Sequence, residues 1–406
     1  MPPATALTSP HVSRTTPVTS GRSAGKLTIA LAATSAVTAA NVYLSQPLLG
    51  AIAESLDATP GVLGALPTAT QLGYAAGILL VVPTGDSRDR RKLILRLGTA
   101  SAVALIGCAL APTVWWLITA SLVVGLLSAI PQLVTPLAVA LAEGKSSGRV
   151  VGAVQAGLLV GVLASRAYSG ALADLVGWRG VYVCSSVLTL GLMAVLARML
   201  PSVPPTNAGT YRAALGSLPR LAVQPLVWRV VSSATMVGVA FGAFWTTLTF
   251  LLAEQYGFGS TQIGLFGLVA AASAVASPWA GRLADRAGRF GAMATLIGLV
   301  IVGWLVLLPG GTNLWWLVAG VIVLDIGVWG NQAACQALLF TLDPATHNRL
   351  NTVYFTLRFL GIAMGSMLGP LLWVGGGWPA VVLVGAASAL VGLVLGVLPM
   401  RREQPR

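Results

Sequence analysis

Long apolar runs separated by short polar stretches repeat along nearly the whole chain. Each run has about 20 residues or more, the length that an α-helix needs to cross the hydrocarbon core of a bilayer. Lipid cannot satisfy unpaired backbone groups, so the runs are predicted to be helices. The expected class is therefore an all-α polytopic membrane protein with twelve transmembrane helices, approximately at residues 27–49, 61–84, 93–111, 115–142, 150–173, 178–200, 230–253, 262–281, 291–309, 314–340, 350–374 and 379–399.

The second half of the chain repeats the first. The basic stretch 82–92 lies between the second and third predicted spans, and residues 281–289 occupy the same place between the eighth and ninth. Trp115 and Trp116 likewise match Trp315 and Trp316 at an offset of 200 residues. Such self-similarity indicates two parallel six-helix repeats.

The polar segments divide this repeat into parts. The expected domains are a disordered cytoplasmic tail (1–26), an N-terminal six-helix bundle (27–200), a cytoplasmic linker (201–229), a C-terminal six-helix bundle (230–399) and a cytoplasmic tail (400–406).

Composition agrees with a membrane protein. Hydrophobic residues are 56% of the chain and charged residues 9%, against about 25% charge in soluble proteins. The net charge of +13 comes from Lys and Arg in short loops and tails on one predicted side, with only Arg179 in the outer loops. This asymmetry predicts a multi-pass protein of the cell membrane with both termini in the cytoplasm, and no nucleic-acid partner.

Enzymatic chemistry has no support in the sequence. The stretch Glu143–Ser146 superficially resembles a phosphate loop, but Val139 stands where the first glycine is required. The three cysteines lie in apolar segments without metal-ligand spacing. We expect no catalytic residue, no metal and no cofactor.

Three charged residues lie deep inside predicted spans, away from the span ends. Asp325 is the only carboxylate deep within one, and Arg166 and Arg358 lie in the fifth and eleventh. A charge at the centre of a spanning helix costs about 2.5–3.5 kcal/mol on insertion scales, so it needs a partner or a water-filled cavity. We predict that all three take part in proton coupling, with ionised Asp325 paired to Arg358. A purely structural Asp325–Arg358 pair is the alternative.

Polar stripes on apolar spans predict a central aqueous pathway. Asp325, Trp329, Gln332 and Gln336 share one helix face by their spacing. Interhelical hydrogen bonding or ordinary packing is the alternative for each polar or aromatic residue. The candidate substrate-cavity residues are Asn41, Gln46, Gln71, Tyr74, Gln155, Trp245, Trp329, Gln332, Gln336 and Tyr354.

Small residues recur every four positions in the fifth and eleventh spans, including Gly157, Gly161, Gly361 and Gly365. Such stripes allow helix backbones to approach closely. They are interpreted as packing surfaces, with sliding surfaces between the two halves as the alternative.

The second basic loop carries the pattern Gly281, Asp285, Arg286, Gly288, Arg289, and the first retains Asp86, Arg90 and Arg91. With the 6+6 repeat, these loops resemble those of the major facilitator superfamily. The stretches 41–49 and 70–74 resemble its bacterial drug:proton antiporter (arabinose-efflux-permease-like) group. Two positions depart from that group: Ser121 stands at the usual fourth-span Arg, and Ser165-Arg166 replaces a fifth-span Gly-Pro. The resemblance implies a conformational latch made of Asp86, Arg90, Arg91, Asp285, Arg286 and Arg289.

The expected function is therefore secondary active transport: proton-coupled efflux of small amphipathic or drug-like molecules by alternating access. The alternatives are an exporter or facilitator of sugars or polar metabolites, and a non-transporting membrane sensor. The expected partners are a small-molecule substrate, protons and the lipid bilayer, with the protein acting as a monomer.

Overall fold

The computed structural model describes residues 21–141, 147–201, 211–343 and 346–397, and every regular element within these ranges is helical. The predicted all-α class is confirmed. The helices of the N-terminal half are α1 (Gly21–Ala40), η1 (Gln46–Leu48), α2 (Leu49–Leu56), α3 (Pro60–Leu63), α4 (Ala65–Leu80), α5 (Thr84–Ser87), α6 (Arg90–Ala109), α7 (Val114–Leu127), α8 (Pro131–Leu141) and α9 (Ser147–Met199). Helix α10 (Tyr211–Ala222) lies in the linker. The C-terminal half contains α11 (Pro225–Tyr256), α12 (Ser260–Phe266), η3 (Gly267–Val275), α13 (Ala276–Leu307), η4 (Leu308–Gly311), α14 (Leu314–Leu339) and α15 (His347–Val397).

Eight helices within the described ranges are long and apolar enough to cross a membrane. Three helices, α9, α13 and α15, bend sharply at Gly177, Gly288 and Gly377, whose φ angles are 71°, 71° and 63°. Only glycine adopts such angles without strain, so each bend joins two helices without a loop. The first predicted span, 27–49, is also interrupted: α1 ends at Ala40, and a turn and η1 follow before α2 begins at Leu49. The total of twelve spans remains a prediction.

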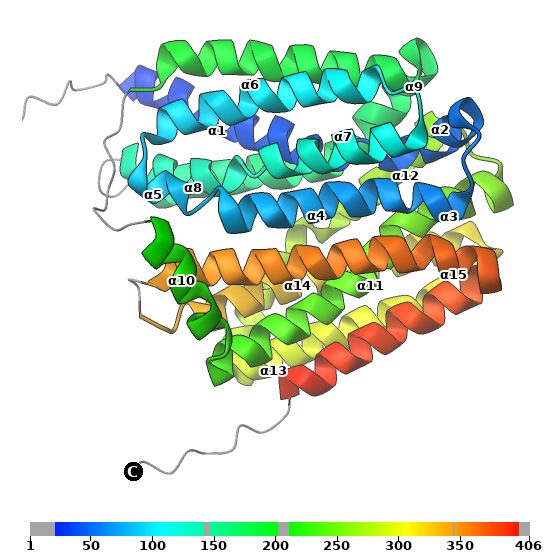
Figure 1. The fold of residues 1–406 in the computed structure, drawn as a ribbon. Coiled ribbons are helices and arrows are strands. Elements are labelled where there is room, and N and C mark those ends of the chain that lie inside the picture. The colour runs from blue at the N-terminus through cyan, green and yellow to red at the C-terminus, as the bar shows by residue number, and fades with distance from the viewer. Residues whose placement is uncertain (1–20, 142–146, 202–210, 344–345, 398–406) are drawn as a thin grey trace, which may run out of the picture.

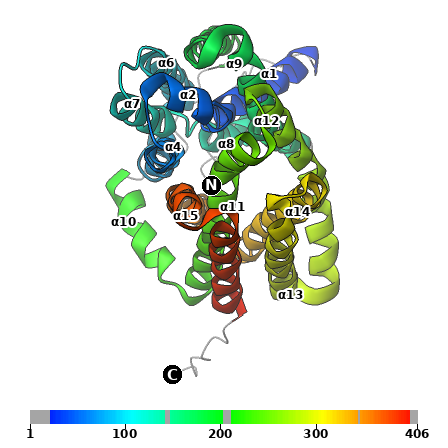
Figure 2. The ribbon, with the colours of Figure 1, turned by 90° about the vertical axis from the view of Figure 1, so that its right-hand side faces the viewer.

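The helices form two bundles that lie side by side (Figures 1 and 2). Helices α1 to α9 form the upper bundle in Figure 1, α11, α13, α14 and α15 form the lower one, and α12 packs against α9. Helices α5 and α10 lie at the left-hand end of that view, and α2 and α3 lie at the right-hand end. We call these ends the linker face and the opposite face.

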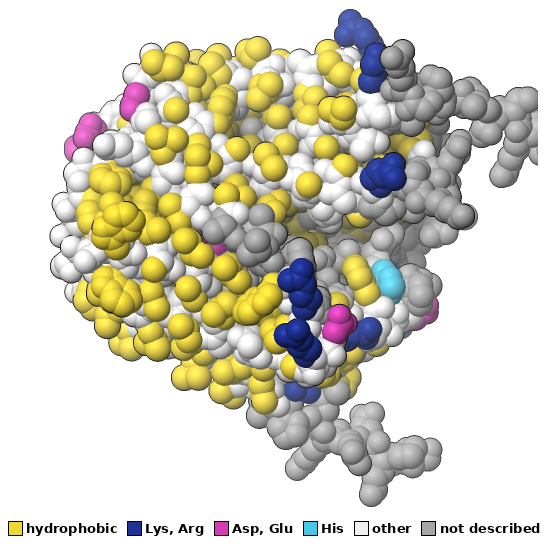
Figure 3. All heavy atoms as spheres, turned by 180° about the vertical axis from the view of Figure 1, so that it is seen from behind, with side chains coloured by type: hydrophobic (Ala, Val, Ile, Leu, Met, Phe, Trp, Pro, Cys, Tyr) yellow, Lys and Arg dark blue, Asp and Glu magenta, His cyan; other side chains and the backbone are white. Residues whose placement is uncertain are grey.

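Hydrophobic side chains cover much of the outer surface between these two ends (Figure 3). Leu175, Leu383 and Trp315 are at least 70% exposed, which a water-facing surface rarely allows over a wide area. The Lys and Arg side chains in the same view gather toward the linker face. The surface is that of a multi-pass membrane protein.

Close backbone packing makes each half rigid. A Cβ at Gly161 of α9 would collide with the carbonyl oxygen of Ala36 in α1, and a Cβ at Gly365 of α15 would collide with that of Val239 in α11. Both pairs join helices of the same half, so the packing interpretation of these stripes is confirmed and the alternative of sliding surfaces between halves is wrong. The two pairs make the same kind of contact in the two halves, so the internal repeat of the sequence is also present in the fold.

The two halves meet tightly at the opposite face. A Cβ at Gly264 of α12 would collide with the backbone of Arg166 in α9, and one at Gly64 would lie 2.9 Å from the Pro370 ring in α15. The Thr68 hydroxyl donates to the carbonyl oxygen of Ala363 across the same boundary, at 3.3 Å. This seam of small residues closes the opposite face.

The linker helix α10 contacts both halves. The Tyr211 hydroxyl donates to the carbonyl oxygen of Leu80 in α4 at 2.9 Å. Arg349 of α15 donates to the Ser217 hydroxyl of α10 at 3.2 Å. One short helix therefore connects the two bundles at the linker face.

The seam makes a first prediction. Gly264→Val places a branched side chain against the Arg166 backbone, so the opposite face should no longer close. A cysteine introduced by Thr68→Cys reports closure through its rate of labelling by a membrane-impermeant maleimide, and we expect at least a tenfold rise in that rate. Gly191→Val is the matched control, because a Cβ at Gly191 meets no atom within 4 Å. Equal labelling rates in both variants would contradict closure by this seam.

Candidate functional site

A narrow cavity of about 50 Å³ lies between the two halves. It is lined from α1, α4, α8 and α9 on one side and from α11, α14 and α15 on the other. Most of its walls are aromatic or aliphatic, and Gln132, Gln155 and Gln332 add amides. We call this the central cavity. Its aromatic lining residues are Tyr43, Tyr74, Phe241, Trp329, Phe355 and Phe359.

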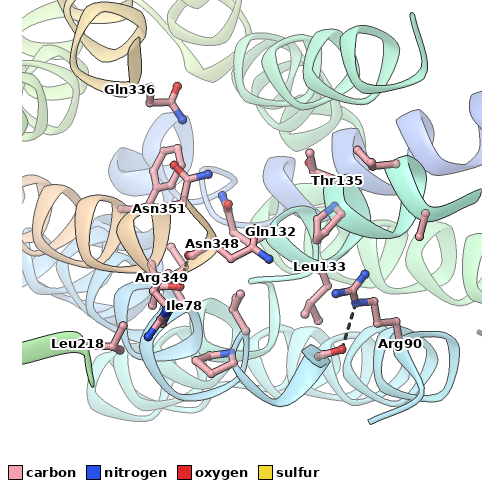
Figure 4. Close-up of a pocket in the computed structure, with 18 of the residues that line it drawn as sticks. Ile78, Arg90, Gln132, Leu133, Thr135, Leu218, Gln336, Asn348, Arg349 and Asn351 are labelled. Carbon is pink, nitrogen blue, oxygen red and sulfur yellow. Dashed lines mark hydrogen bonds between the residues drawn. The ribbon is translucent and has the colours of Figure 1, made fainter. Parts of the chain in front are cut away.

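A larger cavity of about 560 Å³ adjoins it toward the linker face. The two cavities share the lining residues Gln132, Thr135, Gln155 and Phe355, so they are neighbours. We call the larger cavity the vestibule. Its lining side chains come from both halves, as Gln132 and Arg90 do on one side and Gln336 and Asn348 on the other (Figure 4).

Arg166 is buried where the closed seam meets the core of the fold. Its Nε donates to the side-chain oxygen of Gln46 at 2.9 Å, and its Nη1 donates to the carbonyl oxygen of Val162 at 3.3 Å. Its guanidinium carbon lies 3.9 Å from the ring centroid of Trp245 in the other half. A cation over an indole face is stabilised by the ring quadrupole, so this contact joins the halves.

Trp245 also connects this cation to Asp325. The indole Nε1 donates to a carboxylate oxygen of Asp325 at 3.3 Å, and Arg166 acts electrostatically on the same carboxylate. The indole therefore lies between the cation of one half and the acid of the other. The predicted direct pair of Asp325 with Arg358 is wrong, because these two described residues form no ion pair and Asp325 is bound by Trp245 instead.

Arg358 lines the central cavity from α15. It acts electrostatically on the hydroxyls of Tyr43 and Tyr354. Its Nη1 is buried and has no hydrogen-bond partner among the described residues. Arg358 thus lines the central cavity beside Tyr43, with no described carboxylate paired to it.

Half of the predicted cavity residues lie where the sequence places them. Tyr74, Gln155, Trp329 and Gln332 line the central cavity, and Gln336 lines the vestibule.

The other predicted cavity residues are buried behind its walls. Asn41 donates to the Thr189 hydroxyl at 3.2 Å within its own half. Gln46 and Trp245 hold Arg166, as described above. Gln71 and Tyr354 are fully buried and line neither cavity.

Sequence reasoning missed several lining residues. Gln132 follows Pro131 in an apolar run, and a lone amide there is a signal that was not used. Phe355 and Phe359 are four residues apart on α15 and face the cavity, but phenylalanine in an apolar helix carries no such signal.

The predicted latch residues of the two loops lie in different surroundings. Asp285, Arg286 and Arg289 are exposed around the bend at Gly288. Arg90 donates to the carbonyl oxygen of Gly85 at 3.0 Å, and Arg91 donates to that of Ala197 at 2.6 Å. The last two contacts lie within the N-terminal half. The side chain of Asp86 lies outside the described residues, so its latch role remains a prediction.

A two-bundle helical fold with a cavity between the halves is the architecture of a membrane transporter. The chain matches the sequence model of the Major Facilitator Superfamily over residues 31–366 and 233–406, and it belongs to that family. It is 34% identical over 367 residues to the uncharacterized transporter YgaY of Escherichia coli, with 90% of this chain and 93% of YgaY covered. It is 36% identical over 368 residues to the probable transporter SCO4007 of Streptomyces coelicolor, with 89% and 85% covered.

More distant similarities extend the comparison. The multidrug resistance protein MdtG of Proteus mirabilis is 24% identical, with 79% of this chain and 81% of MdtG covered. A probable sugar efflux transporter of Haemophilus influenzae is 23% identical, with 87% and 88% covered. The solved structure of a bacterial homologue of the human lysosomal transporter Spinster is similar in fold, with a TM-score of 0.73, 14% identity and coverage of 93% and 96%.

A second prediction concerns the contacts by which Trp245 joins Asp325 to Arg166. Trp245→Phe removes the N–H that binds Asp325, and a hydrogen bond to a charged group is worth about 1.5–3 kcal/mol. Trp304→Phe is the control, because its indole nitrogen is equally buried but has no partner among the described residues. We expect Trp245→Phe to lower the melting temperature of the purified protein clearly more than Trp304→Phe does.

A double variant tests the same point. In an Asp325→Asn background, the extra loss caused by Trp245→Phe should shrink, since the charged partner is gone. Equal losses with and without Asp325 would show that the indole contributes packing alone.

Proposed function

We propose that this protein is a secondary active transporter that couples the efflux of small amphipathic molecules to inward proton movement by alternating access. One observation carries the proposal. A buried carboxylate of the C-terminal half, Asp325, is linked through Trp245 to a buried cation of the N-terminal half, Arg166, next to the seam. A charge change at Asp325 would therefore act directly on the contact that closes the opposite face.

The physical basis is the attraction between the two charges. In a low-dielectric interior, an ionised carboxylate near a guanidinium favours the closed seam. A proton on Asp325 removes that attraction, and the cation–indole contact and the packing at Gly264 remain. Protonation would thus shift the population toward a state in which the opposite face separates.

The direction of transport follows from topology and relatives. The Lys and Arg side chains visible in Figure 3 gather toward the linker face, which favours a cytoplasmic location for that face in the bacterial cell membrane. The vestibule opens toward that face and would load cargo from the cytoplasm. The named functions of the Proteus and Haemophilus relatives are both forms of efflux or resistance, which supports export.

A second candidate is export or facilitated movement of sugars or polar metabolites. The amides of Gln132, Gln155 and Gln332 at the central cavity favour it, because they can bind hydroxyl groups. Under this alternative, Asp325 and Arg166 only hold the halves together. The two candidates differ in whether Asp325 is required for a pH gradient to drive transport.

A third prediction separates them. Asp325→Asn cannot exchange a proton, so we expect it to abolish pH-gradient-driven flux in proteoliposomes. Binding of a transported substrate should stay within about tenfold, because one neutral hydrogen bond is worth about 1.4 kcal/mol or less. Asp174→Asn is the control, since Asp174 is an exposed carboxylate on α9. If Asp325→Asn still transports at the wild-type rate with the same pH dependence, the coupling role is wrong.

A further inference from the structure

The charged residues that line the transport space all carry the same sign. Among the described lining residues, the central cavity has Arg358, and the vestibule has Arg90 and Arg349. Neither cavity is lined by a described Asp or Glu. We propose, resting on the proposed transport function, that the cargo is an organic anion with an aromatic or apolar body, and that Arg358 binds its acidic group.

Arg358 has the properties of an unoccupied anion partner. Its side chain is 3% exposed, and its buried Nη1 lacks a hydrogen-bond partner in the described part of the chain. A buried guanidinium without a counter-charge is costly, and a carboxylate, sulfonate or phosphate would supply both the charge and the missing acceptor. The planar guanidinium also matches such groups with two parallel hydrogen bonds.

The other buried cation does not compete for this role. Arg166 is bound by Gln46, the Val162 carbonyl and Trp245; its Nη2 also has no partner among the described residues, but it lines neither cavity. Its contacts are with the protein itself. Arg358 is therefore the deep cation that remains available to a cargo.

The surroundings of Arg358 fit an amphipathic partner. Tyr74 and Phe359 pack edge to face with their ring centroids 4.6 Å apart, and Phe241 and Trp329 do so at 6.2 Å. These rings line the same central cavity as Arg358. An acid bound at Arg358 would therefore place its attached apolar body against aromatic walls, where burial is favourable.

An organic cation meets the opposite conditions. Asp325, the acid deep in the C-terminal half, is 1% exposed and lines neither cavity. A cationic cargo would meet Arg358 in the central cavity, and no described acid lines that cavity. Like charges in a desolvated site are strongly unfavourable, so the cavity discriminates against cations by repulsion.

The first test compares three probes on the wild-type protein. Naphthalene-2-sulfonate, naphthalene-2-sulfonamide and 2-naphthyltrimethylammonium share one aromatic body and differ mainly in charge. A ligand that binds the native state raises its melting temperature. We expect the sulfonate to raise it and the other two probes to leave it unchanged at equal concentration. Equal shifts with all three probes, or none with the sulfonate, would overturn the proposal.

The second test changes the cation. Arg358→Gln should weaken sulfonate binding at least tenfold, as loss of a charge-assisted bond implies, and Arg358→Lys should retain part of the affinity. Arg282→Gln is the control, because Arg282 is exposed and lines neither cavity. Wild-type affinity in a folded Arg358→Gln variant would refute the assignment. If that variant does not fold, Arg358→Lys and the wild-type probe comparison decide.

Flux measurements separate this inference from the proposed function. If the sulfonate binds through Arg358 but a pH gradient does not move it in proteoliposomes, anion specificity stands and proton-coupled efflux fails. If a pH gradient drives the neutral or cationic probe and Arg358→Gln has no effect, efflux stands and anion specificity fails.

Discussion

The contact of Arg166 with the other half is the interaction on which the conformation of the molecule depends. A guanidinium buried inside a bilayer loses its hydration and needs other polar or aromatic contacts in its place. Both halves of the molecule supply these contacts to Arg166. Gln46 and a backbone carbonyl do so from one side, and the face of Trp245 does so from the other. The backbone of Arg166 also packs against Gly264. Closing the opposite face therefore satisfies a buried charge, and the space between the halves remains open only toward the linker face.

Glycine contacts occur both within each half and between the two halves, and the two kinds have different consequences for motion. Gly161 and Gly365 bring helices of one half together at backbone distance, so neither bundle can deform without losing dispersion contacts. Gly264 makes a similar approach between the halves. Its seam is short and contains polar groups that water could solvate if the halves moved apart. Motion is thus expected at the seam and not within a bundle.

Much of the fold could be predicted from the sequence, because a bilayer imposes span length and forces helical hydrogen bonding. The duplication and the polar faces could also be predicted, since periodicity places Trp329 and Gln332 on one side of their helix. The residue that contacts Asp325 could not be predicted from the sequence. Helical spacing indicates which side chains share a face, but not which residue of another helix lies opposite. The sequence predicts a pair of Asp325 with Arg358, and only the contact of Arg166 with Trp245 shows otherwise.

The same limit explains the partial success with the cavity. A polar residue inside a span has two ways to be satisfied, by an aqueous space or by a neighbouring helix, and the sequence cannot distinguish them. Gln155 faces the space, whereas Asn41 binds Thr189. Aromatic walls such as Phe359 were missed for the converse reason: an apolar side chain has the same pattern whether it faces lipid, core or cargo.

The linker helix has a consequence for molecules that enter the vestibule. Because α10 is bound to α4 through Tyr211 and to α15 through Ser217, the two rims of the vestibule are tied to a single short rod. Leu218 of α10 and Arg349, which binds Ser217, also line the vestibule. A mutation in this helix would therefore change both the connection between the halves and the surface that an entering molecule first meets.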